Sequence, residues 1–74
     1  MMEERILEII CKTLEISKEQ LTESIDNDEI WDSLQRVEII FSIEDEYGIT
    51  FSEDELSELL TPIKLINITK GKAK

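Results

Sequence analysis

The chain has no histidine, one cysteine, one proline and two glycines among its 74 residues. The missing histidine removes the usual base that activates a serine for catalysis. The single cysteine, Cys11, excludes an internal disulfide and is typical of a reducing compartment. Because proline and glycine are rare, few residues interrupt helical segments, and the composition favours helices.

A membrane-length apolar run and a basic leader are also missing. No apolar run approaches the roughly 20 residues of a spanning helix, and the first residues, MMEERILEII, are acidic where a secretory signal is basic. We therefore expect a cytoplasmic protein without membrane insertion. A chain of this length predicts one domain, residues 1–74, with residues 70–74 as a frayed tail. So small a domain buries about 60% of its unfolded surface, which leaves little room for a deep active site.

Basic residues are scarce over most of the chain. The net charge is −10. Residues 1–58 hold all 18 acids and four basic residues, a net charge of −14, whereas residues 59–74 hold four lysines and no acid. A body this acidic repels nucleic acid and anionic membranes and attracts basic protein surfaces. We expect a monomer that binds basic protein partners and no nucleic acid.

The apolar residues recur with a helical period. In residues 2–16 one face carries Ile6, Leu7, Ile10, Cys11 and Leu14, and Ile9 and Ile16 lie off it. Further helices are predicted at 33–47, 53–59 and 62–69, with a turn or two at 18–23 and a loop at 24–31. The result is an all-α fold, a four-helix bundle with a short third helix.

Capping signals support these helix boundaries. Serine or aspartate precedes a glutamine or glutamate by three residues at Ser17, Asp32 and Ser52, which is capping-box spacing. Thr61-Pro62 is a further helix start. Gly48 after the 33–47 segment predicts a left-handed helix end.

The apolar arc of the 33–47 segment is too wide for one face of a surface helix. Ile39, Ile40, Ile43 and Tyr47 form a face that suits a core. Leu34, Val37 and Phe41 form a second strip, flanked by Glu38, Glu44 and Asp45. The strip is either an apolar docking surface rimmed by acids or more of the core, and the pattern leaves both open.

Ser33 stands at the start of this helix, between Asp32 and Leu34. Serine is a common helix-start residue, so a capping role explains it without any function. A catalytic role is disfavoured because no histidine is present. An exposed hydroxyl at a helix N-terminus can also carry a phosphate group, because the free N–H groups and the helix dipole favour an anion there.

Three other features have structural explanations. Read from Asp26, an EF-hand loop needs Gly at its sixth position and Glu at its twelfth, but the chain has Trp31 and Val37, so we expect no metal site. Trp31 is expected to cap the core, with contact to a ligand or partner as the alternative. Cys11 is expected to be a small buried filler.

The sequence resembles the acyl carrier protein family. The resemblance rests on Asp32-Ser33-Leu34, the motif DSL, followed by VEIIFSIEDEYGI, and it extends over the order of the helices and the TP start of the last one. It implies that 4′-phosphopantetheine is esterified to Ser33 and that its thiol carries an acyl group as a thioester. Acyl carrier proteins are carriers and not enzymes.

The resemblance also implies roles for individual residues. Asp32 would lie beside the phosphate and help recognition by the phosphopantetheinyl transferase, and Leu34 completes the attachment motif. The positions that match partner docking are Leu34, Val37, Glu38, Phe41, Glu44 and Asp45. Their partners would be acyl- or aminoacyl-loading and acyl-transferring enzymes with basic docking surfaces.

The chain departs from many fatty-acid carriers around the motif. Ile30-Trp31 precedes it where a glycine is common, and Gln35-Arg36 follows it where an acid is common. WDSL together with FSEDEL resembles stand-alone specialised carriers, including those for D-alanine. The function that the family resemblance implies is an acyl carrier of fatty-acid, lipid or secondary-metabolite synthesis. A D-alanyl or aminoacyl carrier and an unmodified acidic interaction module are the alternatives.

Overall fold

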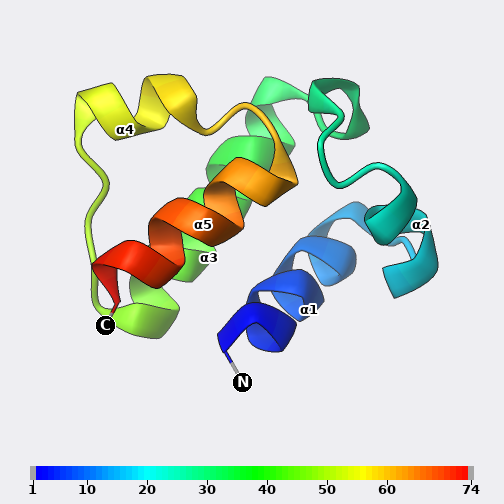
Figure 1. The fold of residues 1–74 in the computed structure, drawn as a ribbon, viewed down its shortest axis with the longest axis horizontal. Coiled ribbons are helices and arrows are strands. Elements are labelled where there is room, and N and C mark those ends of the chain that lie inside the picture. The colour runs from blue at the N-terminus through cyan, green and yellow to red at the C-terminus, as the bar shows by residue number, and fades with distance from the viewer. Residues whose placement is uncertain (1, 74) are drawn as a thin grey trace.

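In the computed structural model, which describes residues 2–73, the chain is all-helical. The elements are α1 (Met2–Leu14), α2 (Lys18–Glu23), the short 3-10 helix η1 (Asp28–Ile30), α3 (Ser33–Tyr47), α4 (Glu53–Glu58) and α5 (Pro62–Lys72). Helix α1 packs against α2, α3 and α5, and the short α4 lies apart from α1 at the other side of the bundle (Figure 1). The predicted all-α bundle is confirmed, and the predicted short helix before the last one is α4, which lies between α3 and α5 in the sequence.

The helices begin where their capping residues predict. Ser17, Asp32 and Ser52 each accept a hydrogen bond from the backbone N–H three residues later, and that residue's side chain accepts from the capping backbone in return. Thr61 caps α5 with Pro62 as its first residue. Each box satisfies two N–H groups that a helix start otherwise leaves unpaired.

The ends of three helices, α1, α4 and α5, differ from the prediction. Helix α1 stops at Leu14, two residues early, because Glu15 is left-handed with φ 56°. This turn lets the Ile16 N–H bond the Cys11 carbonyl at 3.1 Å. Helix α4 ends at Glu58 instead of residue 59. Helix α3 ends at left-handed Gly48, φ 64°, as predicted.

Helix α5 continues three residues past its predicted end. Residues 70–72, expected to fray, are helical, because the Lys72 ammonium lies 3.0 Å from a Glu55 carboxylate oxygen and 5.9 Å from the centre of the Phe51 ring. Residue 74 of the expected tail lies outside the described residues. The loop predicted at 24–31 contains η1, which Asn27 caps by accepting from the Glu29 N–H.

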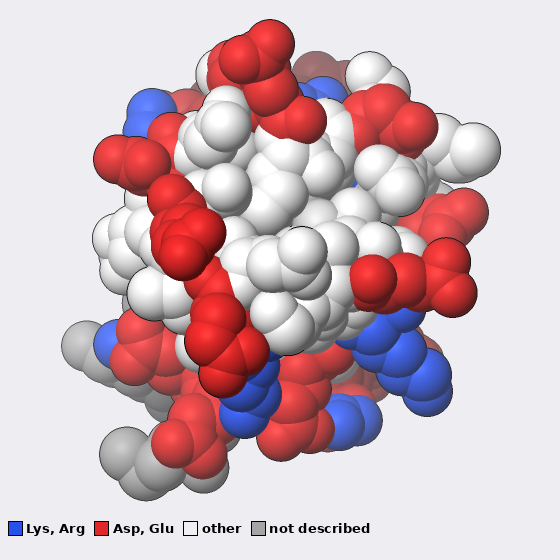
Figure 2. Space-filling model, turned by 90° about the vertical axis from the view of Figure 1, so that its right-hand side faces the viewer, with Lys and Arg blue, Asp and Glu red and all other residues white. Residues whose placement is uncertain are grey.

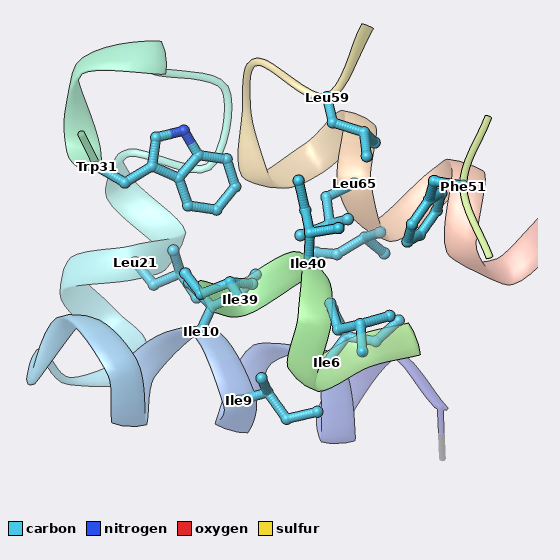
Figure 3. Close-up of a cluster of buried hydrophobic side chains, with 12 residues drawn as sticks. Ile6, Ile9, Ile10, Leu21, Trp31, Ile39, Ile40, Phe51, Leu59 and Leu65 are labelled. Atoms are coloured by element: carbon cyan, nitrogen blue, oxygen red, sulfur yellow. The ribbon is translucent and has the colours of Figure 1, made fainter. Parts of the chain in front are cut away.

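One apolar core fills the space between the helices. Figure 3 shows most of its buried side chains, which are Ile6, Ile9, Ile10, Leu21, Trp31, Ile39, Ile40, Ile43, Phe51, Leu59, Leu65 and Ile66. The helical pattern predicts that Ile9 lies off the apolar face of α1, and this prediction is wrong, because Ile9 is buried. It is buried because α1 is covered from several sides, including by α3. Leu7, Cys11 and Leu14 are only partly buried against this core.

Candidate functional site

The start of α3 presents Ser33 to solvent. Asp32 is the N-cap, and its Oδ1 accepts from the Gln35 N–H at 2.7 Å while the Asp32 N–H donates to the Gln35 side chain at 3.2 Å. Ser33 is the first helical residue, and its side chain is exposed. Because Asp32 performs the capping, the Ser33 hydroxyl has no hydrogen-bonding duty among residues 2–73.

The segment before Ser33 is fixed to the rest of the bundle by burial and by hydrogen bonds to residues near α5. Trp31 is buried, at 6% exposure, and its indole N–H donates to the Leu60 carbonyl at 3.1 Å. The Ile63 N–H, at the start of α5, donates to the Ile25 carbonyl at 2.7 Å. The prediction that Trp31 caps the core is confirmed, and its bond to the connection between α4 and α5 is a long-range contact that no local pattern reveals.

These residues suit a phosphate ester on Ser33. The hydroxyl is free, and the first turn of α3 contains no acid and includes Arg36. Helix-start N–H groups not used by the capping box favour an anion at this position. The donors present therefore fit the phosphodiester of a phosphopantetheine group, which supplies a thiol that can hold an acyl group as a thioester.

The second apolar strip of α3 is on the surface. Leu34 is 68% exposed, Phe41 64% and Val37 39%. Ile39, Ile40 and Ile43 are buried, and Tyr47 is half-buried with its hydroxyl bonded to the Met2 carbonyl. The structure thus decides between the two explanations of the wide arc: one face is core, and the strip is a surface.

Two further apolar side chains, Leu56 and Leu60, are exposed at 39% and 41%. They lie on α4 and in the connection that follows it. Sequence reasoning missed them as candidate surface residues. Their spacing of four in a segment of helical period gave no means of telling a surface position from a core position, because exposure depends on how α4 packs.

The three acids predicted beside the strip do not act alike. Glu38 and Asp45 are exposed and line a groove between α3 and α1, together with Arg5 and Lys12. Glu44 is half-buried and accepts from the Phe51 N–H at 2.9 Å. One of its carboxylate oxygens therefore fastens α3 to the segment leading into α4. Figure 2 shows one face of the molecule, on which acidic side chains border an uncharged surface.

Other kinds of site find no support in the part of the chain that is described. Residues 2–73 contain no cluster of three or more side chains that could hold a metal ion. None of their helices is long and apolar enough to cross a membrane. Burial raises the pKa of the half-buried Cys11 thiol, and Glu19 raises it further against the opposing effect of Lys18. A raised pKa makes this thiol a poor nucleophile at neutral pH.

A helical bundle with a free serine at a helix start and an exposed apolar strip beside it is suited to carry a covalent group to other proteins. Residues 4–68 match the family model described as "Phosphopantetheine attachment site". The chain is 31% identical over 71 residues to an acyl carrier protein of Petrotoga mobilis, covering 93% of this chain and 84% of that one. It is 36% identical over 72 residues to an acyl carrier protein of Buchnera aphidicola, covering 95% and 90%. No solved structure matches.

The chain belongs to the acyl carrier protein family. Membership implies a covalently attached 4′-phosphopantetheine and the role of a carrier instead of an enzyme. It also implies interaction with a phosphopantetheinyl transferase and with acyl-handling enzymes.

Proposed function

We propose that Ser33 is the residue that bears the 4′-phosphopantetheine group. The observation that carries this proposal is the exposed, unbonded Ser33 hydroxyl at the first position of α3, inside the DSL motif. In the attachment step a P–O bond forms between the Ser33 oxygen and the phosphopantetheine phosphorus of coenzyme A. The pyrophosphate bond breaks, adenosine 3′,5′-bisphosphate leaves, and the serine proton passes to a base of the transferase.

Asp32 assists recognition by the transferase in this proposal. Its Oδ1 is used in the capping box, and its exposed carboxylate adds a negative charge directly beside the serine. A negative charge next to the reacting hydroxyl suits an enzyme whose own surface is basic, because charge complementarity orients two proteins as they meet. Leu34 supplies apolar contact area on the other side of Ser33.

The strip of Leu34, Val37 and Phe41, with Glu38 and Asp45 nearby, serves as the docking surface for partner enzymes, both the phosphopantetheinyl transferase and acyl-handling enzymes. Glu44 belongs to this set by position, although its bond to Phe51 gives it a structural duty as well. A small apolar contact with an acidic rim produces fast and reversible association, which a carrier that serves several enzymes needs. We place this activity in the cytoplasm, in a monomer whose residues 1–74 act as one domain.

The cargo class that the family suggests is an acyl group in fatty-acid, lipid or secondary-metabolite synthesis. A second candidate, a D-alanyl or aminoacyl carrier, is favoured by Arg36. This residue places a cation within the proposed docking helix, one turn beyond Ser33. A cation there weakens attraction to the basic surfaces that ordinary acyl carriers meet and suits a more specialised partner.

The test is the intact mass of the protein after incubation with coenzyme A and a promiscuous phosphopantetheinyl transferase. Ser33→Ala is compared with Ser42→Ala, which removes another exposed serine from the same helix. Wild type and Ser42→Ala should each gain one phosphopantetheine, and Ser33→Ala none. Because Asp32 is the cap, Ser33→Ala should change the free energy of unfolding by less than about 0.5 kcal/mol. No gain on folded wild type with several transferases would instead favour the unmodified interaction module.

A further inference from the structure

Two connections that are distant in sequence are joined by reciprocal hydrogen bonds. The connection before α3 donates from the Trp31 indole to the Leu60 carbonyl at 3.1 Å. In the other direction, Ile63 at the start of α5 donates to the Ile25 carbonyl at 2.7 Å. The segment that leads to Ser33 is therefore fixed against the segment that joins α4 to α5.

The backbone conformation of Trp31 couples the position of its indole to the orientation of the Asp32 side chain and to the start of α3. Its φ of −137° and ψ of 154° are extended, and side chains of successive extended residues point to opposite sides. The buried indole lies in the core cluster with Leu21 and Ile39 (Figure 3). Burial of Trp31 thus turns Asp32 outward and sets where the first turn of α3 begins.

Helix α4 depends on its connections for its position. None of the six residues of α4 is buried. Its apolar anchors are the buried Phe51 before it and the buried Leu59 after it, and within the helix the ion pair of Glu55 with Lys72 attaches it to α5. An element with few buried apolar contacts moves at low free-energy cost. The bond that Trp31 makes to Leu60, the residue after Leu59, therefore restrains the carboxyl end of α4.

We propose that Trp31 is a positioning residue for modification of Ser33, because its indole N–H holds the attachment site and the carboxyl end of α4 in one fixed arrangement. In this proposal an enzyme that binds at Ser33 also contacts Leu60, which is 41% exposed. The position of Leu60 relative to Ser33 is then already fixed before the enzyme binds. Without the bond, that arrangement must be ordered during binding, which weakens binding without altering the chemistry at the serine. This inference rests on the proposed attachment of phosphopantetheine to Ser33.

The test compares Trp31→Phe with Tyr47→Phe. Each substitution keeps an aromatic ring and removes one partly buried hydrogen bond from a side chain to a backbone carbonyl; the Tyr47 hydroxyl bonds Met2 at 3.3 Å. Tyr47 lies at the opposite end of α3 from Ser33. A third variant, Leu60→Ala, removes the exposed side chain but retains the backbone carbonyl that accepts the bond.

Two quantities are measured on each variant: amide hydrogen exchange of the apo protein, and steady-state kinetics of phosphopantetheine transfer. Trp31→Phe should speed exchange in residues 32–36 and 56–61 together by about fivefold, since losing one hydrogen bond shifts a local equilibrium by roughly that factor. The transferase KM for the carrier should rise by a similar factor, with kcat within about twofold. Tyr47→Phe should change neither the exchange rates of these two segments nor the transferase KM. Leu60→Ala should leave the exchange of residues 32–36 unchanged.

The inference is overturned if Trp31→Phe speeds exchange in only one of the two segments, or if Tyr47→Phe raises KM equally. Should Trp31→Phe not fold, replacing the Trp31 indole with a benzothiophene of the same shape removes the N–H and keeps the volume. A wild-type protein that gains no phosphopantetheine refutes the proposed function, and the exchange measurement still decides whether the two segments are coupled.

Discussion

At the scale of single residues, adjacent positions divide the work at the start of α3. Trp31 faces the core, Asp32 caps the helix, and Ser33 is left exposed with a free hydroxyl. If Ser33 were the N-cap residue, its hydroxyl would accept a hydrogen bond from a backbone N–H of the first turn. Because Asp32 is the cap, modification of Ser33 costs no capping hydrogen bond.

The backbone conformation of Glu15 lowers the stability of the folded protein. Glu15 is the one residue other than glycine with positive φ in the described chain, at φ 56°. A left-handed conformation costs a residue with a Cβ roughly 1–2 kcal/mol. Glu15→Gly should therefore raise the free energy of unfolding by about 0.5–1 kcal/mol, after allowing for the greater freedom of glycine in the unfolded chain. Urea denaturation at pH 7 measures the change.

Glu15→Ala is the matched control at the same position. It removes the negative charge from the carboxyl end of α1, where the helix dipole disfavours an anion, but it keeps the left-handed strain. It should therefore gain a few tenths of a kcal/mol at most. Equal gains in Glu15→Gly and Glu15→Ala would mean that charge, and not backbone strain, is what limits stability here.

At the scale of elements, the starts of the helices could be predicted and some of their ends could not. A capping box involves residues three apart, so Asp32 with Gln35 and Ser52 with Glu55 are visible in the sequence. The early end of α1 depends on a left-handed glutamate, which the residue type disfavours. The longer α5 depends on Lys72 meeting Glu55 from another helix.

The candidate site divides in the same way. The capping pair of Asp32 with Gln35 and the presence of a second apolar strip on α3 follow from one helix and its periodicity, but the periodicity left open whether that strip is surface or core. The bond from Trp31 to Leu60 and that from Phe51 to Glu44 join segments through the fold. Tertiary contacts of this kind have no signature in the spacing of residues, and so they could not be predicted.

Glu55 makes the attachment of α4 to α5 sensitive to pH. The hydrogen bond from the Ser52 N–H, followed by the contact with Lys72, lowers the pKa of Glu55 below its ordinary value of 4.5. A group with a lowered folded pKa contributes stability above its unfolded pKa and loses it as the pH falls through the folded pKa. Glu55→Gln should be less stable than wild type at pH 7, and the difference should shrink progressively below pH 4.5.

Glutamine isolates the charge in this experiment, because Gln20 and Gln35 already fill the same capping-box position in α2 and α3. The measurement is urea denaturation of both proteins between pH 3 and pH 7. On a Lys72→Gln background the effect of Glu55→Gln should become smaller, since one of its two main causes is gone. A difference between wild type and Glu55→Gln that is constant with pH would contradict the assigned pKa shift.

At the scale of the whole molecule, charge and apolar surface have separate functions. The chain carries −10 overall, yet the face formed by Leu34, Val37 and Phe41 is apolar. Long-range attraction to a basic enzyme comes from the whole acidic body, whereas the lifetime of the complex depends on the apolar contact. The two contributions can be separated, because they affect different rate constants.

Surface plasmon resonance against a phosphopantetheinyl transferase should show this separation. Raising the ionic strength from about 0.05 to 0.5 M should lower the association rate constant by roughly tenfold or more, because the Debye length contracts severalfold. The combined substitution Glu38→Gln and Asp45→Asn should reduce that salt dependence only in part, because the chain has 18 acids and the other 16 remain. Phe41→Ala should keep the full salt dependence and raise the dissociation rate constant, because Phe41 is 64% exposed and contributes contact area instead of charge.

The exposure of Phe41 also means that Phe41→Ala should change the free energy of unfolding by only about 0.5 kcal/mol or less. If Phe41→Ala lowered the association rate constant and left dissociation unchanged, the strip would not be part of the bound interface, and docking would have to be assigned to another face of the bundle.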